Sequence, residues 1–121
     1  MSEILHITHQ NEWLSALENG SYETPTLAKD GFIHCSTAAQ ALRVANTFYT
    51  GQTDLVLLVI DTAKLVSLLK FEGPINPKTG QAETGTDDLF PHVYGALNIE
   101  SVIKVVGFPP NADGTFSLPE I

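Results

Sequence analysis

The sequence has one cysteine, one arginine and no long apolar run. Because Cys35 stands alone, an internal disulfide and a multi-cysteine zinc site are excluded. The longest apolar run, LVLLVI at 55–60, is too short to cross a bilayer, and the first residues lack a signal-peptide pattern. We therefore expect a cytoplasmic protein that does not engage a membrane.

Positive charge is also scarce. Fourteen Asp and Glu residues stand against six Lys and Arg residues, which gives a net charge of −8. A surface that binds DNA or long RNA would carry clustered Lys and Arg, so we expect no DNA partner. A small anionic metabolite or nucleotide needs only one or two donors and remains a candidate partner.

The chain of 121 residues, 43% of them hydrophobic, has the length and composition of one globular domain with one core. We expect an α+β fold of five to seven strands with two main helices near the N-terminus. Strands are predicted over 3–8, 31–36, 54–61, 65–73 and 101–108, with a weaker one over 114–119. Helices are predicted over 9–20 and 37–51.

Two segments are interpreted as connections. Residues 22–30 contain Pro25, which indicates a break between regular elements. Residues 74–89 are polar and contain two prolines and two glycines. A loop of that length is uncommon inside a compact domain and is often functional or mobile.

Capping residues mark several element ends. Thr8 ends the first strand and is a candidate cap for the helix that follows it. Thr37 and Gln40 have the spacing of a capping box, and Asp61 can cap a short turn. In the helix after Thr37, apolar residues that recur at helical spacing predict the core-facing side, namely Ala41, Val44, Ala45 and Phe48.

Strand alternation sorts the residues of GFIHCS at 31–36. Phe32, His34 and Ser36 share one face, whereas Ile33 and Cys35 point into the expected core. A buried free cysteine is usually inert. In the first strand, His6 and Thr8 face away from Leu5 and Ile7. The sequence thus predicts two histidines on the less apolar faces of two strands that can be neighbours.

Ser36 and Thr37 precede a helix N-terminus, whose free N–H groups favour phosphate or carboxylate. They are candidate ligand-binding residues, and Arg43, about two turns into the helix, is a candidate phosphate ligand. The alternative is that the two hydroxyls only cap the helix.

His92 and Tyr94, in FPHVYG at 90–95, are further candidates for ligand binding. The alternative for each is structural. His92 could bond a carbonyl across a turn, and Tyr94 could be a buried ring with a satisfied hydroxyl.

GFIHCST with a downstream Gln, followed later by FPHVYG, resembles a small bacterial and plant family catalogued as domain of unknown function 952. A His in the first strand, a Trp in the first helix and a Glu-Gly after the third apolar stretch also match, so the resemblance covers nearly the whole chain. It implies a split antiparallel sheet like that of ADP-ribosyltransferases. It also implies membership of their two-histidine branch, which includes RNA 2′-phosphotransferases that consume NAD.

The resemblance places His6 and His34 at the two histidine positions. In that superfamily the first histidine typically bonds a ribose hydroxyl of NAD, and the second helps to hold the substrate or its diphosphate. A third position is often an acid but is hydrophobic in this branch, and Glu72 is the candidate for it here. NAD is implied as a substrate, and no bound cofactor is firmly implied. Because the 2′-phosphotransferases use several arginines on RNA, the single Arg43 disfavours an RNA substrate.

Cleavage of a nicotinamide glycosidic bond passes through an oxocarbenium-like state that needs a fixed ribose, a nearby negative charge and an aromatic face. His6 and His34 could fix the ribose, Glu72 could supply the charge, and Tyr94 or Phe32 the ring. We expect the pocket between the sheet and residues 74–95.

Three functions remain as hypotheses: an ADP-ribosyl or NAD-derived nucleotide enzyme, a non-catalytic metabolite- or nucleotide-binding module, and a metal-dependent enzyme. The third would use His6, His34 and His92 around zinc, although no two of them have short ligand spacing. A nucleophilic pair of Cys35 and His34 is disfavoured because adjacent strand residues point to opposite faces.

Overall fold

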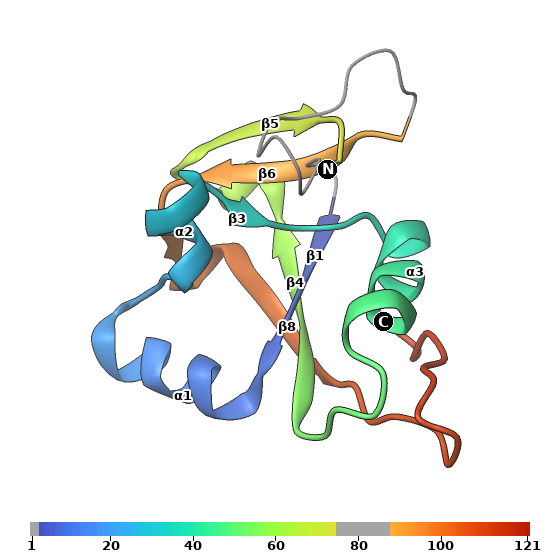
Figure 1. The fold of residues 1–121 in the computed structure, drawn as a ribbon. Coiled ribbons are helices and arrows are strands. Elements are labelled where there is room, and N and C mark those ends of the chain that lie inside the picture. Colours follow the sequence, from blue (N-terminus) through green and yellow to red (C-terminus); the bar gives the residue numbers. More distant parts are fainter. Residues whose placement is uncertain (1–2, 75–87) are drawn as a thin grey trace.

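The computed structural model describes residues 3–74 and 88–121 (Figure 1). It is a mixed α+β fold of antiparallel sheets and few helices, as the sequence predicts. The elements in chain order are β1 (Glu3–His9), α1 (Gln10–Asn19), β2 (Ser21–Tyr22), α2 (Pro25–Asp30), β3 (Ile33–His34), α3 (Ala38–Phe48), β4 (Leu55–Asp61), a 3₁₀ turn (Thr62–Lys64), β5 (Leu68–Glu72), β6 (Phe90–Tyr94), β7 (Leu97–Asn98), a second 3₁₀ turn (Ile99–Ser101) and β8 (Val102–Gly107).

The strands form two three-stranded antiparallel sheets, ordered β1-β4-β8 and β3-β6-β5, and a small β2-β7 pair. In Figure 1 the β3-β6-β5 sheet lies across one end of the β1-β4-β8 sheet. A backbone bridge joins the two sheets, because the N–H groups of Leu5 and Ser36 each donate to the other residue's carbonyl at 2.7 Å. The strands that carry His6 and His34 are therefore neighbours at this bridge.

The core lies on both faces of β1 and β4, and all seven residues of β4 are buried. On one face Ile4, Leu58 and Ile60 pack against Trp13 of α1 and against Ile33 and Cys35 from the other sheet. On the opposite face the core residues are Leu5, Ile7, Leu55, Leu57, Val59, Ala41, Ala45, Phe108 and Phe116. The predicted alternation of β1 and of residues 32–36 is confirmed, and so is the burial of Cys35, which is 2% exposed.

Two of the three predicted caps are confirmed. At α3 the Gln40 N–H donates to Thr37 Oγ1 at 3.3 Å, and the Thr37 N–H donates to Gln40 Oε1 at 3.0 Å. The Asp61 carboxylate accepts from the Ala63 N–H at 2.9 Å. The prediction for Thr8 is wrong, because His9 is the N-cap of α1. The Thr8 hydroxyl instead forms hydrogen bonds with the side chains of Glu12 and Tyr22.

Two predicted element assignments are wrong. Residues 22–30 contain α2, because Pro25 stands in its first turn, where a fixed φ and a missing N–H favour a helix start. Residues 114–119 form no strand. The Asn111 N–H bonds the Thr115 carbonyl at 2.6 Å in a tight turn, and the Phe116 N–H donates to Asn46 Oδ1 at 2.7 Å instead of to a strand.

Smaller differences between prediction and structure concern the length of one strand and the exposure of one helix residue. The regular part of the strand predicted over 31–36 is Ile33–His34. Phe48, expected in the core, is the last residue of α3 and is 71% exposed. Most of the predicted loop at 74–89 lies outside the described residues. In the described part of the chain, no helix is long and apolar enough to span a membrane.

Candidate functional site

A pocket of about 630 Å³ lies where the two sheets meet, a size that suits a small molecule. Its lining comes from both sheets and from the ends of the helices. Residues that line it include His6, Thr8, Glu12, Tyr22, His34, Ser36, Phe48, Tyr49, Pro74, Phe90 and His92. Four of the nine residues predicted for the site are therefore in the wall, namely His6, His34, Ser36 and His92.

His6 begins a buried hydrogen-bonded chain. Its Nδ1 donates to the His34 carbonyl at 2.6 Å, and its Nε2 lies 2.8 Å from the Tyr22 hydroxyl. The Tyr22 hydroxyl donates to Thr8 Oγ1 at 2.8 Å, and the Thr8 hydroxyl donates to Glu12 Oε2 at 2.7 Å. His6 thus touches the His34 backbone rather than its ring.

Burial controls the ionisation of this chain. It lowers the pKa of His6 to about 4, against smaller raising contributions that include the bond to the His34 carbonyl and the charge of Glu12. Burial also raises the pKa of Tyr22 and that of the Cys35 thiol above their ordinary values. This burial disfavours a Cys35 nucleophile, because the thiolate is the reactive form.

His92 is the centre of a second group. It lies on β6 directly opposite Lys70 of β5 and His34 of β3, and only 2% of it is exposed. Its Nδ1 is 2.9 Å from Glu72 Oε1, and the Tyr94 hydroxyl donates to the same oxygen. The bond from Tyr94 is the main cause that lowers the pKa of Glu72, and the same bond raises the pKa of Tyr94 to about 12.

This arrangement fixes the tautomer of His92. Because Glu72 is an ionised acceptor, Nδ1 carries the hydrogen, and in the neutral ring Nε2 carries a lone pair. Nε2 has no hydrogen-bond partner among residues 3–74 and 88–121, and His92 lines the pocket. Burial lowers the pKa of His92, while the Glu72 hydrogen bond opposes that shift, so the ring is neutral at neutral pH.

The predicted aromatic residues Phe32 and Tyr94 form a cluster with His92. The Phe32 ring stacks on it with centroids 4.0 Å apart and an interplanar angle of 17°, and Tyr94 lies 5.2 Å from Phe32. Phe32, Tyr94 and Glu72 are absent from the pocket wall that the described residues form. The aromatic rings in that wall are instead Tyr22, Phe48, Tyr49 and Phe90.

His34 occupies the pocket edge. Its Nε2 pairs with Asp30 Oδ2, at the end of α2, at 3.0 Å, and its side chain is 42% exposed. Its ring centroid is 5.5 Å from that of His92. The pair at His34 and His92 therefore offers two imidazoles to a ligand from neighbouring strands.

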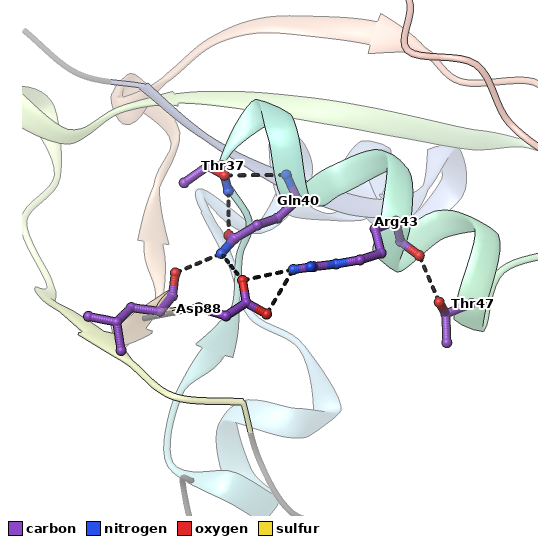
Figure 2. Close-up of polar contacts among 6 residues, drawn as sticks. Thr37, Gln40, Arg43, Thr47 and Asp88 are labelled. Atoms are coloured by element: carbon purple, nitrogen blue, oxygen red, sulfur yellow. Dashed lines mark hydrogen bonds and ion pairs between the residues drawn. The ribbon is translucent and has the colours of Figure 1, made fainter. Parts of the chain in front are cut away.

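The N-terminus of α3 is closed by the chain itself, as Figure 2 shows. Gln40 Nε2 donates to Asp88 Oδ1 at 3.2 Å and to the Leu89 carbonyl at 2.7 Å. Arg43 Nη2 donates to both Asp88 oxygens, at 2.8 and 2.9 Å. These bonds from Arg43 and Gln40 lower the pKa of Asp88, with the Arg43 bond as the main cause.

Asp88 therefore engages the Arg43 guanidinium, which was a candidate phosphate ligand, and the Gln40 side chain. Neither Thr37 nor Arg43 lines the described pocket, and the Thr37 hydroxyl is used in the capping box. Of the two alternatives left open by the sequence, the geometry favours the structural cap for Thr37. Ser36 remains in the pocket wall, beside the bridge to β1.

The three histidines proposed for zinc do not form a ligand set. Among the described residues no three His, Cys, Asp or Glu side chains are placed to hold a metal ion. His6 has both ring nitrogens engaged by Tyr22 and the His34 carbonyl.

Glu12, Thr8 and Tyr22 are pocket residues that the sequence did not identify as candidates. Tyr22 lies in a segment interpreted as a connection, and Glu12 looks like an ordinary first-turn acid of a helix. The only local indication is that Thr8 and Glu12 are four residues apart across a strand–helix junction.

Comparison with known proteins identifies a family. The model of the family described as protein of unknown function DUF952 matches residues 7–105. No curated protein matches the chain.

Solved structures with the same fold come from protein CC0527 of Caulobacter crescentus. Its crystal structure is 31% identical over 97% of this chain and 95% of that chain, with a TM-score of 0.79. The crystal structure of a double mutant of the same protein gives the same TM-score at 30% identity over the same shares. The solution NMR structure is 33% identical over 95% of this chain and 91% of that one, with a TM-score of 0.74.

Proposed function

The chain belongs to the DUF952 family, and we propose that it is an enzyme that cleaves or transfers at the glycosidic bond of an NAD-derived nucleotide. The pocket between the two sheets would hold the nucleotide. His92 would be the general base, Glu72 would orient it, and His34 would contact the ligand.

The observation that carries an enzymatic function is the placement of His92. A buried imidazole that lines a pocket and whose Nδ1–H is held by a carboxylate has the arrangement of a general base. Its lowered pKa keeps the lone pair available at neutral pH.

We propose a single displacement at C1′ of the ribose. An acceptor O–H, from water or a hydroxyl, gives its proton to His92 Nε2 while its oxygen bonds C1′ of the ribose. The bond from C1′ to the nicotinamide nitrogen breaks, and its electron pair leaves with neutral nicotinamide. The ribose passes through an oxocarbenium-like state, which a nearby carboxylate stabilises. Glu12 lines the described pocket and Glu72 does not, so Glu12 is the candidate for that carboxylate.

The choice of an NAD-derived substrate rests on resemblance to the ADP-ribosyltransferase-like fold. Two features support it: the sheet is divided between β1 and β3, and these strands carry His6 and His34 beside the pocket. The described pocket wall has no Lys or Arg, so we infer recognition of the nucleoside part more than of the diphosphate. A ribose bond from His6 would need one of its present hydrogen bonds to open.

The test is a turnover assay with NAD that measures release of nicotinamide. We expect His92→Gln to lower the rate by about a hundredfold or more, the usual contribution of a general base, with little change in NAD affinity. Lys104→Gln is the matched control, because Lys104 is exposed on β8 and absent from the described pocket wall. NAD binding without turnover in the native protein would instead support the binding module. That alternative is favoured by His6, whose nitrogens both serve internal contacts.

A further inference from the structure

The hydrogen-bonded series His6–Tyr22–Thr8–Glu12 is unusual in the number of hydrogens that its contacts need. Its contacts, including the one to the His34 carbonyl, measure 2.6, 2.8, 2.8 and 2.7 Å. Each is short enough to need a hydrogen between its two atoms. The Thr8 hydroxyl, the Tyr22 hydroxyl and a neutral His6 supply one hydrogen each. The four contacts therefore require one more hydrogen than these groups carry when Glu12 is ionised.

The extra hydrogen has two possible positions. When Tyr22 donates to Thr8 and Thr8 donates to Glu12, His6 Nε2 must donate to Tyr22, which makes His6 an imidazolium. When all three donors reverse, a protonated Glu12 donates to Thr8, Thr8 to Tyr22, and Tyr22 to a neutral His6. Both arrangements fill the same four contacts and differ only in which end holds the proton.

We propose that His6, Tyr22, Thr8 and Glu12 form a proton relay, whose one exchangeable proton rests either on His6 or on the Glu12 carboxyl. All four side chains line the pocket, and His6, Thr8 and Tyr22 are 7%, 3% and 1% exposed. Water therefore has little access to the middle of the chain, and a proton moves between its ends through the hydroxyls.

The environment decides which end is favoured. Burial lowers the pKa of His6 to about 4, which disfavours the imidazolium, while the bond to the His34 carbonyl and the charge of Glu12 act in the opposite direction. The other titratable groups near the relay are His34 beside His6, and Cys35 and Tyr49 beside Tyr22. Tyr49 also faces Glu12. No Lys or Arg lines this part of the described pocket.

The use of the relay in catalysis rests on the proposed function. When a reacting group takes a proton from Glu12 or gives one to it, the shared proton can shift along the two hydroxyls between Glu12 and His6. The relay itself requires no ligand, so it is tested in the ligand-free protein. Its failure and a failure of NAD binding are separate results.

The test is an NMR pH titration that follows the His6 ring nitrogens and the Glu12 carboxyl carbon together. In the native protein, loss of the shared proton should change both signals with one common midpoint. In Glu12→Gln the amide N–H₂ permanently supplies the extra hydrogen, so His6 should lose this transition. In Thr8→Val, which keeps the shape of the side chain, Glu12 should titrate without a response at His6.

Glu18→Gln is the matched control, because Glu18 is an exposed acid of the same helix that lies outside the described pocket wall. It should retain the common transition. The proposal is overturned when the His6 nitrogens of the native protein do not respond to titration of Glu12, or when Glu12→Gln leaves their response unchanged. Glu12 is exposed, so this variant is expected to fold even if Thr8→Val does not.

Discussion

At the scale of single residues, Glu72 gains a role that differs from the acid expected from the sequence. It lies outside the described pocket wall and accepts hydrogen bonds from His92 and Tyr94. Its contribution is to hold His92 in one tautomer and to oppose the effect of burial on the pKa of that ring. Of the two partners, the histidine is the one in the described pocket wall.

Glu72→Gln tests this pairing. The amide keeps an acceptor oxygen but loses the charge, so burial acts on His92 with less opposition and its pKa falls further. His92 should take up a proton at a lower pH than in the native protein, as measured by NMR of its ring carbon protons. As a weaker base it should also reduce turnover.

Glu100→Gln serves as the control, because Glu100 is exposed and lies in the 3₁₀ turn after β7. It should leave the midpoint of His92 unchanged. A midpoint that rises in Glu72→Gln, or does not move, would contradict the role given to Glu72.

The strand face on which each side chain lies was the most predictable feature of the site. The period of two in 32–36 and in β1 correctly separated Phe32 and His34 from Ile33 and Cys35, and His6 and Thr8 from Leu5 and Ile7. Alternation does not indicate what lies opposite a side chain. Thus it could not show that Phe32 stacks on His92, or that His6 bonds Tyr22 from β2.

At the scale of elements, α3 shows a cap that could be predicted and a partner that could not. The Thr37 and Gln40 capping box depends on local spacing alone. The Asp88 carboxylate, which joins Gln40 and Arg43, comes from the beginning of the segment that leads into β6. Such a contact depends on the tertiary fold. It gives Arg43 an acceptor within the chain itself.

Thr37→Ala should lower the free energy of unfolding by about 1 kcal/mol, because one N–H of the first turn loses its acceptor. Urea denaturation measures this change. Thr47→Ala, on the same helix and exposed, should change stability by less than about 0.5 kcal/mol. Since Thr37 is absent from the described pocket wall, ligand affinity should remain that of the native protein, and a large loss of affinity would restore its predicted role in binding.

The missed helix α2 illustrates a second limit of local patterns. Pro25 was interpreted as a break, yet proline in the first turn favours a helix. The distinction depends on whether the following residues can pack, and Leu27 does pack against the core. The end of α2 then supplies Asp30, the partner of His34.

At the scale of the whole molecule, the pocket follows from how the sheets meet. β1 and β3 share the bridge at Leu5 and Ser36, and each carries a histidine beside it. That these two strands can be neighbours was predicted from the sequence pattern, whereas the pocket wall also uses β2, α3 and the start of α1. These elements come together only in the tertiary fold, so the sequence did not predict that Tyr22, Phe48 and Glu12 line the pocket.

The central claim is that this pocket binds an NAD-derived nucleotide against His34 and His92. The most direct measurement is an NMR titration of labelled protein with NAD, ADP-ribose and a 2′-phosphorylated nucleotide. We predict saturable shifts at His6, His34, Ser36 and His92, with smaller changes at Thr37 and Arg43, which lie outside the described pocket wall. No shifts at millimolar ligand, or shifts confined to residues away from the pocket, would contradict the proposed function.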